Sequence, residues 1–297
     1  MRQGSPRATQ PASRRRGDFA GLLGAALLAA PVLTGLAYAI GASLGVLGPG
    51  HSGHASVVRV ARVLADRATW DGVVWTLWIA SCATTLAVIG AVVVAVAFQG
   101  NSRGDRLGRA LAALSLPIPH LVAGVLGVWL LGQSGILARV AFSLGLIAHP
   151  ADMPALVYDR LGLGLVLTLA WKEMAFLAIV ASALLVTRGA AAEEAARTLG
   201  ASPLEAFRRV TWPLLWRGLA PAVVAVFVFA AGNYEVAALL APSNPLALPL
   251  LVAQRVTDPD LARHADAYVV SVLLLVIAGA AVVVHEWVRS RWEPFAP

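Results

Sequence analysis

Charged residues and cysteine are both scarce in this sequence. Aspartate, glutamate, lysine and arginine make up 13% of its 297 residues, which is about half of their share in a typical soluble domain. Cys82 is the single cysteine and Lys172 the single lysine. One cysteine excludes an internal disulfide, and a lysine with no glycine-rich loop before it excludes the phosphate-binding loop of an ATPase. We therefore expect that this chain does not hydrolyse ATP.

Catalytic and metal-binding patterns are also missing. The six histidines are scattered, and no Cys/His set has the spacing of a zinc site. His51 and His54 lie three residues apart in a glycine-rich segment, where we interpret them as solvated. The sequence contains no G-x-S-x-G nucleophile turn, and the segments between its apolar runs are too short for a soluble catalytic domain. We predict no catalytic residue, no bound metal and no cofactor.

Apolar residues dominate instead, at 59% of the chain. A helix of about 20 apolar residues crosses a bilayer, and six runs reach this length. We predict an all-α membrane protein with six transmembrane helices within residues 19–290, between a disordered cytoplasmic N-terminus (1–18) and a cytoplasmic tail (291–297). The first run follows three arginines and resembles a signal peptide, but its length favours a retained anchor. The expected spans are 19–47, 72–98, 107–131, 161–186, 219–240 and 267–288.

Two apolar segments are irregular. Pro117 and Pro119 lie inside the third expected span and should break or kink it, since proline cannot donate a backbone hydrogen bond. Residues 135–148 are apolar but too few to span a bilayer, and Arg139 interrupts them. We therefore interpret residues 135–148 as an interfacial or re-entrant helix.

The net charge of +7 is arranged as in a membrane protein rather than in a nucleic-acid binder, because the arginines are scattered between apolar runs. With the N-terminus inside, six spans place 15 arginines on the inner side and 7 on the outer side. Cytoplasmic loops are enriched in positive residues. We therefore expect both termini in the cytoplasm and no nucleic-acid partner, whereas a seventh span would spoil this bias.

Residues 193–213 are the most polar stretch in this apolar sequence. Residues 190–199 are strong helix formers, and Gly200 follows where a helix C-terminus favours a left-handed residue. Residues 202–205 form a capping box with proline in the first turn of a second helix. We predict two short helices joined by a tight turn, ended by Trp212-Pro213. The second helix should carry its apolar side chains on one face: Leu204, Phe207 and Val210.

Within this stretch the sequence resembles the cytoplasmic loop of permease subunits of type I ABC importers. The family pattern is E-A-A, three residues, G, nine residues and I-x-L-P. Glu194-Ala195-Ala196, Gly200 and Pro213 match it at this spacing. Val210 replaces isoleucine, which is a mild change, whereas Trp212 in place of leucine is a real departure.

The resemblance implies a permease core in the bacterial inner membrane and a coupling loop (188–217) that is seated in a cleft of a separate ATPase subunit. It also implies a second permease, identical or homologous, because an ATPase dimer presents two clefts, and an extracytoplasmic binding protein that delivers a small solute. The arrangement is most similar to permeases for polyamines, ferric iron, thiamine or oxyanions. The implied coupling residues are Glu193, Glu194, Ala195, Ala196, Gly200, Phe207 and Pro213. From the residues alone, the stretch is an exposed helical unit, and an amphipathic hairpin on the membrane surface stays an alternative.

Polar side chains inside the expected spans mark a candidate translocation pathway. Charged residues in a bilayer face the bundle interior and often line a pathway, the alternative being an ion pair between helices. Lys172 and Glu173 point about 100° apart on a helix, so they cannot neutralise each other on one face. If Lys172 pairs with one glutamate, the other can face the pathway, which favours a cation such as a polyamine over an oxyanion. The candidate pathway residues are Lys172, Glu173, Asn233, Tyr234 and Glu235.

Two other classes of function stay open. A secondary transporter could use Lys172, Glu173 and Glu235 as a proton relay, although the sequence lacks the inverted repeat that such folds often show. A non-transport membrane scaffold would leave the intramembrane charges unexplained. The proline-rich outer segment 242–264 is either an ordinary loop or a docking edge for a binding protein.

Overall fold

All regular structure is helical in the computed structural model, which describes residues 13–48 and 54–292. No strand occurs within those residues. Six helical segments are long and apolar enough to cross a membrane, which confirms the predicted all-α membrane fold. These candidate spans are Leu23–Ser43, Arg67–Ala97, His120–Ser143, Leu163–Thr187, Pro203–Gly232 and Arg263–Arg291.

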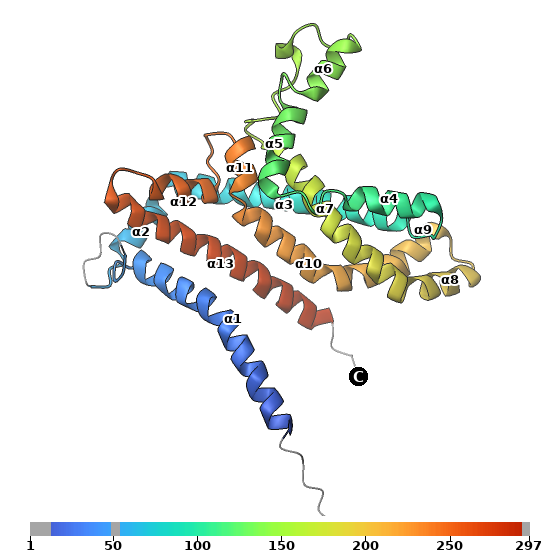
Figure 1. Ribbon diagram of the computed structural model, residues 1–297, viewed down its shortest axis with the longest axis horizontal. Coiled ribbons are helices and arrows are strands. Elements are labelled where there is room, and N and C mark those ends of the chain that lie inside the picture. The colour runs from blue at the N-terminus through green and yellow to red at the C-terminus, as the bar shows by residue number, and fades with distance from the viewer. Residues whose placement is uncertain (1–12, 49–53, 293–297) are drawn as a thin grey trace, which may run out of the picture.

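Four long helices pack along the length of the molecule (Figure 1). They are α3 (Arg67–Ala97), α7 (Leu163–Leu184), α10 (Trp212–Gly232) and α13 (Leu261–Trp292). The first helix, α1 (Ser13–Ser43), lies against α13 at the edge of this bundle. The bundle therefore has a central layer of α3, α7 and α10 with α1 and α13 on one side.

The long helices run in the directions expected if successive spans cross the membrane in alternating directions. Trp75 near the start of α3 and Leu165 near the start of α7 share an apolar cluster with Ala230 near the end of α10. Val73 of α3 shares another cluster with Val269 near the start of α13. The starts of α3, α7 and α13 therefore meet the end of α10 at the same end of the bundle.

The two ends of the bundle carry different short helices. One end holds α2 (Val58–Ala65) and α12 (Leu248–Val256), and we call it the α12 end. The opposite end holds α8 (Ala190–Thr198) and α9 (Pro203–Ala206), and we call it the α8–α9 end. The segment 242–264, expected to be a loop or docking edge, thus contains a helix of its own.

Small side chains allow α3 and α7 to approach closely. An added Cβ at Gly90 of α3 would lie 2.5 Å from Sδ of Met174 in α7, so the backbone of α3 passes directly over that side chain. Close backbone approach maximises dispersion contacts, which matter most where lipid is as apolar as the protein. The small residues buried in the two helices include Ala80, Ala83, Ala87, Ala91 and Ala95 of α3, and Ala170, Ala175, Ala178 and Ala181 of α7.

The predicted bounds of the third span, 107–131, are wrong. Residues 107–131 form two helices, α4 (Arg103–Ala113) and α5 (His120–Leu131), which are separated at the two prolines as predicted. The apolar candidate span is His120–Ser143, which joins α5 to α6 (Ile136–Ser143). Part of segment 135–148 therefore belongs to a candidate span rather than lying outside the spans, and α5 and α6 project from the bundle (Figure 1).

The fifth expected span is also displaced. Helix α10 begins at Trp212 rather than at residue 219, so the prediction that Trp212-Pro213 ends a helical unit is wrong. Proline stands there directly after a π-helical turn (Phe207–Thr211), where the regular ladder of i to i−4 hydrogen bonds is already interrupted. The helix then ends at Gly232, and residues of the expected span continue as a separate helix, α11 (Glu235–Leu240).

The predicted boundaries of the N-terminal segment (1–18) and of the C-terminal tail (291–297) both differ from those in the structure. Helix α1 begins at Ser13, so residues 13–18, expected to be disordered, are helical. Helix α13 extends to Trp292 and thus includes the start of the expected tail. Residues 1–12 and 293–297, and with them the rest of both predictions, lie outside the described residues, as does His51.

The contact between Gly164 of α7 and the preceding loop can be tested by substitution. A Cβ at Gly164 would lie 2.2 Å from the carbonyl oxygen of Leu156, to which the Gly164 N–H also donates at 2.8 Å. We expect Gly164→Ala to lower the free energy of unfolding by roughly 1–3 kcal/mol, because a backbone atom must move. Gly232→Ala is the matched control, since nothing lies within 4 Å of that position. Thermal unfolding of the purified protein measures both, and equal melting temperatures for the two variants would contradict the expectation.

Candidate functional site

The polar stretch forms a helical unit between two long helices at the α8–α9 end. Helix α7 continues through a π-helical turn (Leu185–Gly189) into α8, and α9 continues through a second π-helical turn (Phe207–Thr211) into α10. We call residues 185–211 the α8–α9 unit. Because both of its ends are continuous with helices of the central layer, a displacement of the unit must move α7 and α10.

The turn of the α8–α9 unit has the predicted chemistry. Gly200 has φ of +90°, and the Ala201 N–H donates to the carbonyl of Ala196 at 3.1 Å. The Ser202 N–H donates to the Glu205 carboxylate at 3.0 Å, which completes the capping box of α9. An L-residue with a side chain is strained at this φ, so the glycine is required by backbone conformation rather than by space.

The two adjacent glutamates of α8 have different roles. Glu193 is half-buried and accepts a hydrogen bond from the Thr211 hydroxyl at 3.0 Å, and Thr211 is buried. That bond ties α8 to the beginning of α10. Glu194 is exposed, as is its neighbour Ala195, whereas Ala196 is half-buried. Glu193 therefore stabilises the unit internally, and Glu194 is the carboxylate that a partner could contact.

The apolar residues of the unit do not share one face as predicted. Leu199 is 89% exposed and Leu204 is 65% exposed, so both lie on the surface beside the Gly200 turn. Phe207 instead packs on the buried cluster between α3, α7 and α10. A π-helical turn starts at Phe207, and its wider spacing shifts the register on which the prediction depended. The exposed apolar tip was missed because leucine in a helix is expected to be buried.

Trp212, the departure from the family pattern, anchors the base of the unit. Its ring lies 6.4 Å from that of Phe207 and stacks on Trp216 at 5.7 Å between centroids. All three rings lie around the start of α10, and Pro213 is exposed in the first turn of that helix. The larger side chain thus replaces the packing that a leucine would supply.

Lys172 and Glu173 bind separate partners in the bundle interior. Lys172 is buried, and its ammonium donates to the carbonyl of Leu116 at 3.3 Å, in the break between α4 and α5. Oε1 of Glu173 lies 3.0 Å from Nε2 of His120, whose ring also packs against Phe229. No ion pair among the described residues joins Lys172 to a glutamate, so the pairing on which the preference for a cation depended is absent there. The sequence signal for His120 was its place directly after the second proline.

Asn233, Tyr234 and Glu235 lie at the break between α10 and α11, apart from the Lys172 group. Oδ1 of the buried Asn233 accepts from the Val236 N–H at 2.9 Å and caps α11. Tyr234 and Glu235 are both exposed. No hydrogen bond or ion pair within residues 13–48 and 54–292 joins these three residues to Lys172 or Glu173. The five candidate pathway residues therefore form two sites rather than one.

Tyr234 lines a hollow of about 770 Å³ at the α12 end. Its walls are the loop around Tyr158 and Arg160, helix α11, the segment 242–246 and helix α12. The polar groups on these walls are Tyr158, Arg160, Tyr234, Ser243, Asn244, Gln254 and Thr257.

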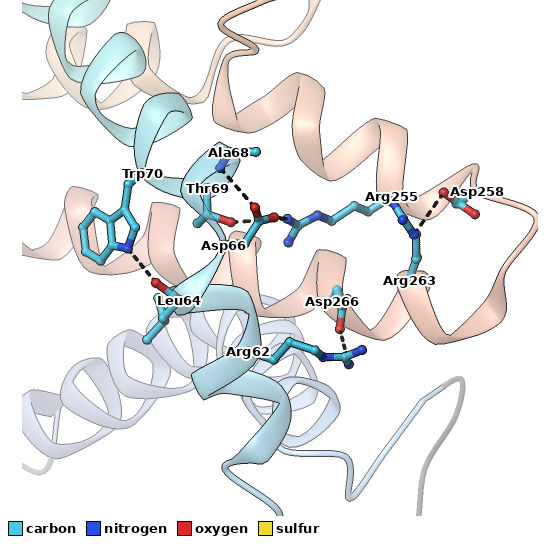
Figure 2. Close-up of polar contacts among 10 residues, drawn as sticks. All are labelled: Arg62, Leu64, Asp66, Ala68, Thr69, Trp70, Arg255, Asp258, Arg263 and Asp266. Atoms are coloured by element: carbon cyan, nitrogen blue, oxygen red, sulfur yellow. Dashed lines mark hydrogen bonds and ion pairs between the residues drawn. The ribbon is translucent and has the colours of Figure 1, made fainter.

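A buried arginine holds α12 in place behind this hollow (Figure 2). Arg255 donates to the carboxylate of Asp66 at 2.9 Å and to the Thr69 hydroxyl at 3.2 Å. The other oxygen of Asp66 accepts from the Ala68 N–H at 3.1 Å and caps α3. Burial lowers the pKa of Arg255, and the charge of Asp66 opposes this shift. Helix α12 is therefore fixed to the start of α3.

Two more ion pairs surround this clamp in Figure 2. Arg62 of α2 pairs with Asp266 of α13 at 3.1 Å, and Arg263 pairs with Asp258 at 3.6 Å. The carboxylate of Asp258, in the segment 242–264, is thus engaged within the fold. Among residues 13–48 and 54–292, no group of three or more His, Cys, Asp or Glu side chains is arranged to hold a metal.

The bundle with its apolar spans and helical unit defines a multi-pass membrane protein, and comparison with known proteins assigns its family. The chain belongs to the family of binding-protein-dependent transport system inner membrane components, whose pattern matches residues 83–292. This family consists of transport permeases rather than enzymes.

Individual relatives support the assignment. The molybdenum transport system permease protein ModB of Mycobacterium tuberculosis is 31% identical over 67% of this chain and 74% of its own length. The inner membrane ABC transporter permease protein YnjC of Escherichia coli is 28% identical over 72% of this chain, which spans only 41% of that relative. A bacterial alginate ABC transporter crystallised with its periplasmic protein has a similar chain, with TM-score 0.72, 15% identity and coverage of 96% of this chain and 98% of its own. That likeness shows the ABC-importer permease fold.

The clamp at Arg255 predicts a stability difference between two arginines. Arg255→Ala removes the guanidinium from one oxygen of Asp66 and from the Thr69 hydroxyl, and we expect it to cost about 2 kcal/mol of unfolding free energy. Arg263→Ala removes an exposed ion pair and should cost at most about 1 kcal/mol. Thermal unfolding of the purified variants measures the difference, and a larger loss for Arg263→Ala would contradict the role given to Arg255.

Proposed function

We propose that this chain is the membrane-spanning permease subunit of an ATP-driven importer, which moves a small solute delivered by a binding protein. The observation that carries the proposal is the α8–α9 unit. It presents Glu194, Leu199 and Leu204 to a partner and continues into α7 and α10 without a loop. A partner that moves the unit can therefore move the central helices, whose other ends border the hollow.

ATP hydrolysis in this scheme belongs to a separate subunit. The family resemblance of the unit supports a dimeric ATPase with two clefts as its partner, and hence a second permease of identical or homologous sequence. Glu194, Ala195 and Gly200 form the proposed contact with the ATPase, while Glu193 and Phe207 hold the contact surface in position. Ala196 and Pro213 complete the base of the unit.

A binding protein is the proposed partner at the opposite end. The structural neighbour was crystallised with a periplasmic protein, and the α12 end of this chain carries both the hollow and the ion-pair clamp. The bias of 15 arginines against 7 supports a cytoplasmic α8–α9 end and cytoplasmic termini. Six alternating crossings would put the α8–α9 unit and α12 on opposite sides of the membrane. The helix directions agree with this, because the unit lies at the end of the bundle opposite to α12.

The contacts do not favour a secondary transporter. A proton relay through Lys172, Glu173 and Glu235 requires groups within hydrogen-bonding distance of one another. Lys172 instead donates to a backbone carbonyl, and Glu173 pairs with His120. These contacts satisfy polar groups that a helix break leaves in an apolar environment.

A charge reversal at Glu194 tests the coupling role. We expect Glu194→Lys to insert and fold normally but to abolish ATP-driven uptake, because an exposed carboxylate at the contact becomes a cation. Gly200→Asp should act similarly through strain at φ of +90°. Glu286→Lys is the control, since Glu286 is half-exposed on α13 and pairs only with the nearby Arg289. Uptake in membrane vesicles measures the effect, and wild-type rates in both test variants would remove the ATPase-docking role.

Labelling of introduced cysteines tests the orientation. After Cys82→Ala, cysteines at Ala192 and Ser290 should resist an impermeant thiol reagent in intact cells, whereas those at Ala151 and Ser243 should react. The reason is that the first pair lies on the proposed cytoplasmic side and the second on the opposite side. Labelling at position 192 from outside would contradict the proposed topology.

A further inference from the structure

A rigid loop presents Arg160 at the rim of the hollow. The indole N–H of Trp75 donates to the carbonyl of Arg160 at 2.9 Å, and the indole N–H of Trp78 donates to the carbonyl of Leu161 at 2.9 Å. The Tyr158 N–H donates to the carbonyl of Leu240 at 3.0 Å. Helices α3 and α11 thus hold three backbone groups within residues 158–161, while the Arg160 side chain is left for the hollow.

The local backbone is strained in a way that favours this geometry. Tyr158 has φ of +62°, a left-handed conformation that a tyrosine adopts only when its surroundings require it. Gly162 also has positive φ, and an added Cβ there would lie 2.3 Å from Cδ1 of Ile79. Strained, tightly pinned loops are commonly found at binding sites. Here the strain places Tyr158 and Arg160 on the same wall of the hollow.

The charge of the hollow has one sign. Arg160 is the only charged residue among those that line it, and its guanidinium forms no ion pair with any described residue. The neighbouring Asp159 uses one oxygen to accept from the Leu161 N–H at 3.0 Å, and its other oxygen is buried. Glu235 follows Tyr234 but is not a lining residue. No carboxylate therefore lines the hollow to compete for the guanidinium.

Three of the remaining polar groups offer hydrogen-bond donors that other contacts leave unused, whereas the hydroxyl of Thr257 already donates to the carbonyl of Ala253. They come from three separate walls: the hydroxyl of Tyr234 at α11, the amide of Asn244, and the amide of Gln254 on α12. None of these side chains has a hydrogen-bond partner in the described part of the chain. A guanidinium with several neutral donors around it matches the acceptor oxygens of an anion, since charge-assisted hydrogen bonds are the strongest of these contacts.

We propose that this hollow is a low-affinity binding site for an inorganic oxyanion, with Arg160 as its charged ligand. Binding of an oxyanion in the hollow does not depend on the proposed function. Its use in transport does, because there the hollow would be the place where the substrate first meets the permease. This assignment reverses the cation expected from a glutamate left to face the pathway. That expectation treated Glu173 as a partner of Lys172 or of the substrate, whereas Glu173 is paired with His120.

Binding by the purified full-length chain tests the site directly. We expect molybdate and sulfate to raise the melting temperature above that in chloride of equal ionic strength, whereas putrescine should not. Arg160→Gln should weaken oxyanion binding about tenfold, the loss typical of one charged hydrogen bond, and Arg160→Lys should retain part of it. The variant should fold normally, because only the backbone of Arg160 is held by other residues.

Arg67→Gln is the matched control. Arg67 lies at the same end, is 93% exposed in its side chain and is not among the lining residues. Its removal should leave the oxyanion effect unchanged. An equal oxyanion response in Arg160→Gln and wild type, or a larger response to putrescine than to molybdate and sulfate, would overturn the site. If the purified chain responds to neither oxyanion but Arg160→Gln no longer retains the binding protein, the hollow is a docking site for that protein and the proposal is wrong.

Uptake separates this inference from the proposed function. In vesicles that carry the whole transporter, Arg160→Gln should raise the KM for molybdate or sulfate uptake about tenfold, while Glu194→Lys should abolish uptake without changing oxyanion binding by the chain. If oxyanions bind through Arg160 but no uptake depends on ATP, the permease role fails and the site stands. If uptake depends on ATP and on Glu194 but Arg160→Gln leaves its KM unchanged, the site fails and the permease role stands.

Discussion

The need to satisfy backbone polar groups in an apolar environment governs the interior of this protein. Pro117 and Pro119 interrupt the helix between α4 and α5, and the carbonyl of Leu116 accepts from Lys172. The second interruption, between α10 and α11, is capped by Asn233. An unpaired carbonyl or N–H in a bilayer costs several kcal/mol, so a break in a helix requires a polar side chain beside it. Lys172 and Asn233, two of the rare polar residues of the spans, therefore lie beside points where helices are interrupted.

These interruptions divide the chain into a rigid centre and two specialised ends. Helices α3, α7 and α10 pack through small residues, which makes the centre dense. At one end α7 and α10 continue through π-helical turns into the α8–α9 unit, and at the other they border the hollow with α11 and α12. A partner at one end and a solute at the other can thus affect the same two helices. The continuity of the helices is the physical basis of the proposed coupling.

Much of the site at the α8–α9 end could be predicted from the sequence, because short-range chemistry determines it. Gly200 and the capping box of Ser202 and Glu205 act within a few residues, so their outcome did not depend on the rest of the fold. The end of the unit could not be predicted in this way. Trp212 and Pro213 usually mark a stop, yet stacking of Trp212 on Trp216 and burial beside Phe207 favour a continuous helix. These contacts, together with packing of Phe207 and Trp212 on the buried cluster of α3, α7 and α10, outweighed the local signal.

The sequence by itself determined the membrane class, the family pattern and the presence of six apolar segments, since each follows from composition or spacing along the chain. Only the tertiary structure decided which polar groups meet. Glu173 lies beside Lys172 in the sequence but pairs with His120, and Arg160 is brought to α11 and α12 by indoles of α3. Pairings of this kind join residues far apart in the chain, and burial in a low dielectric makes their energies large. Adjacency along the chain therefore does not predict them.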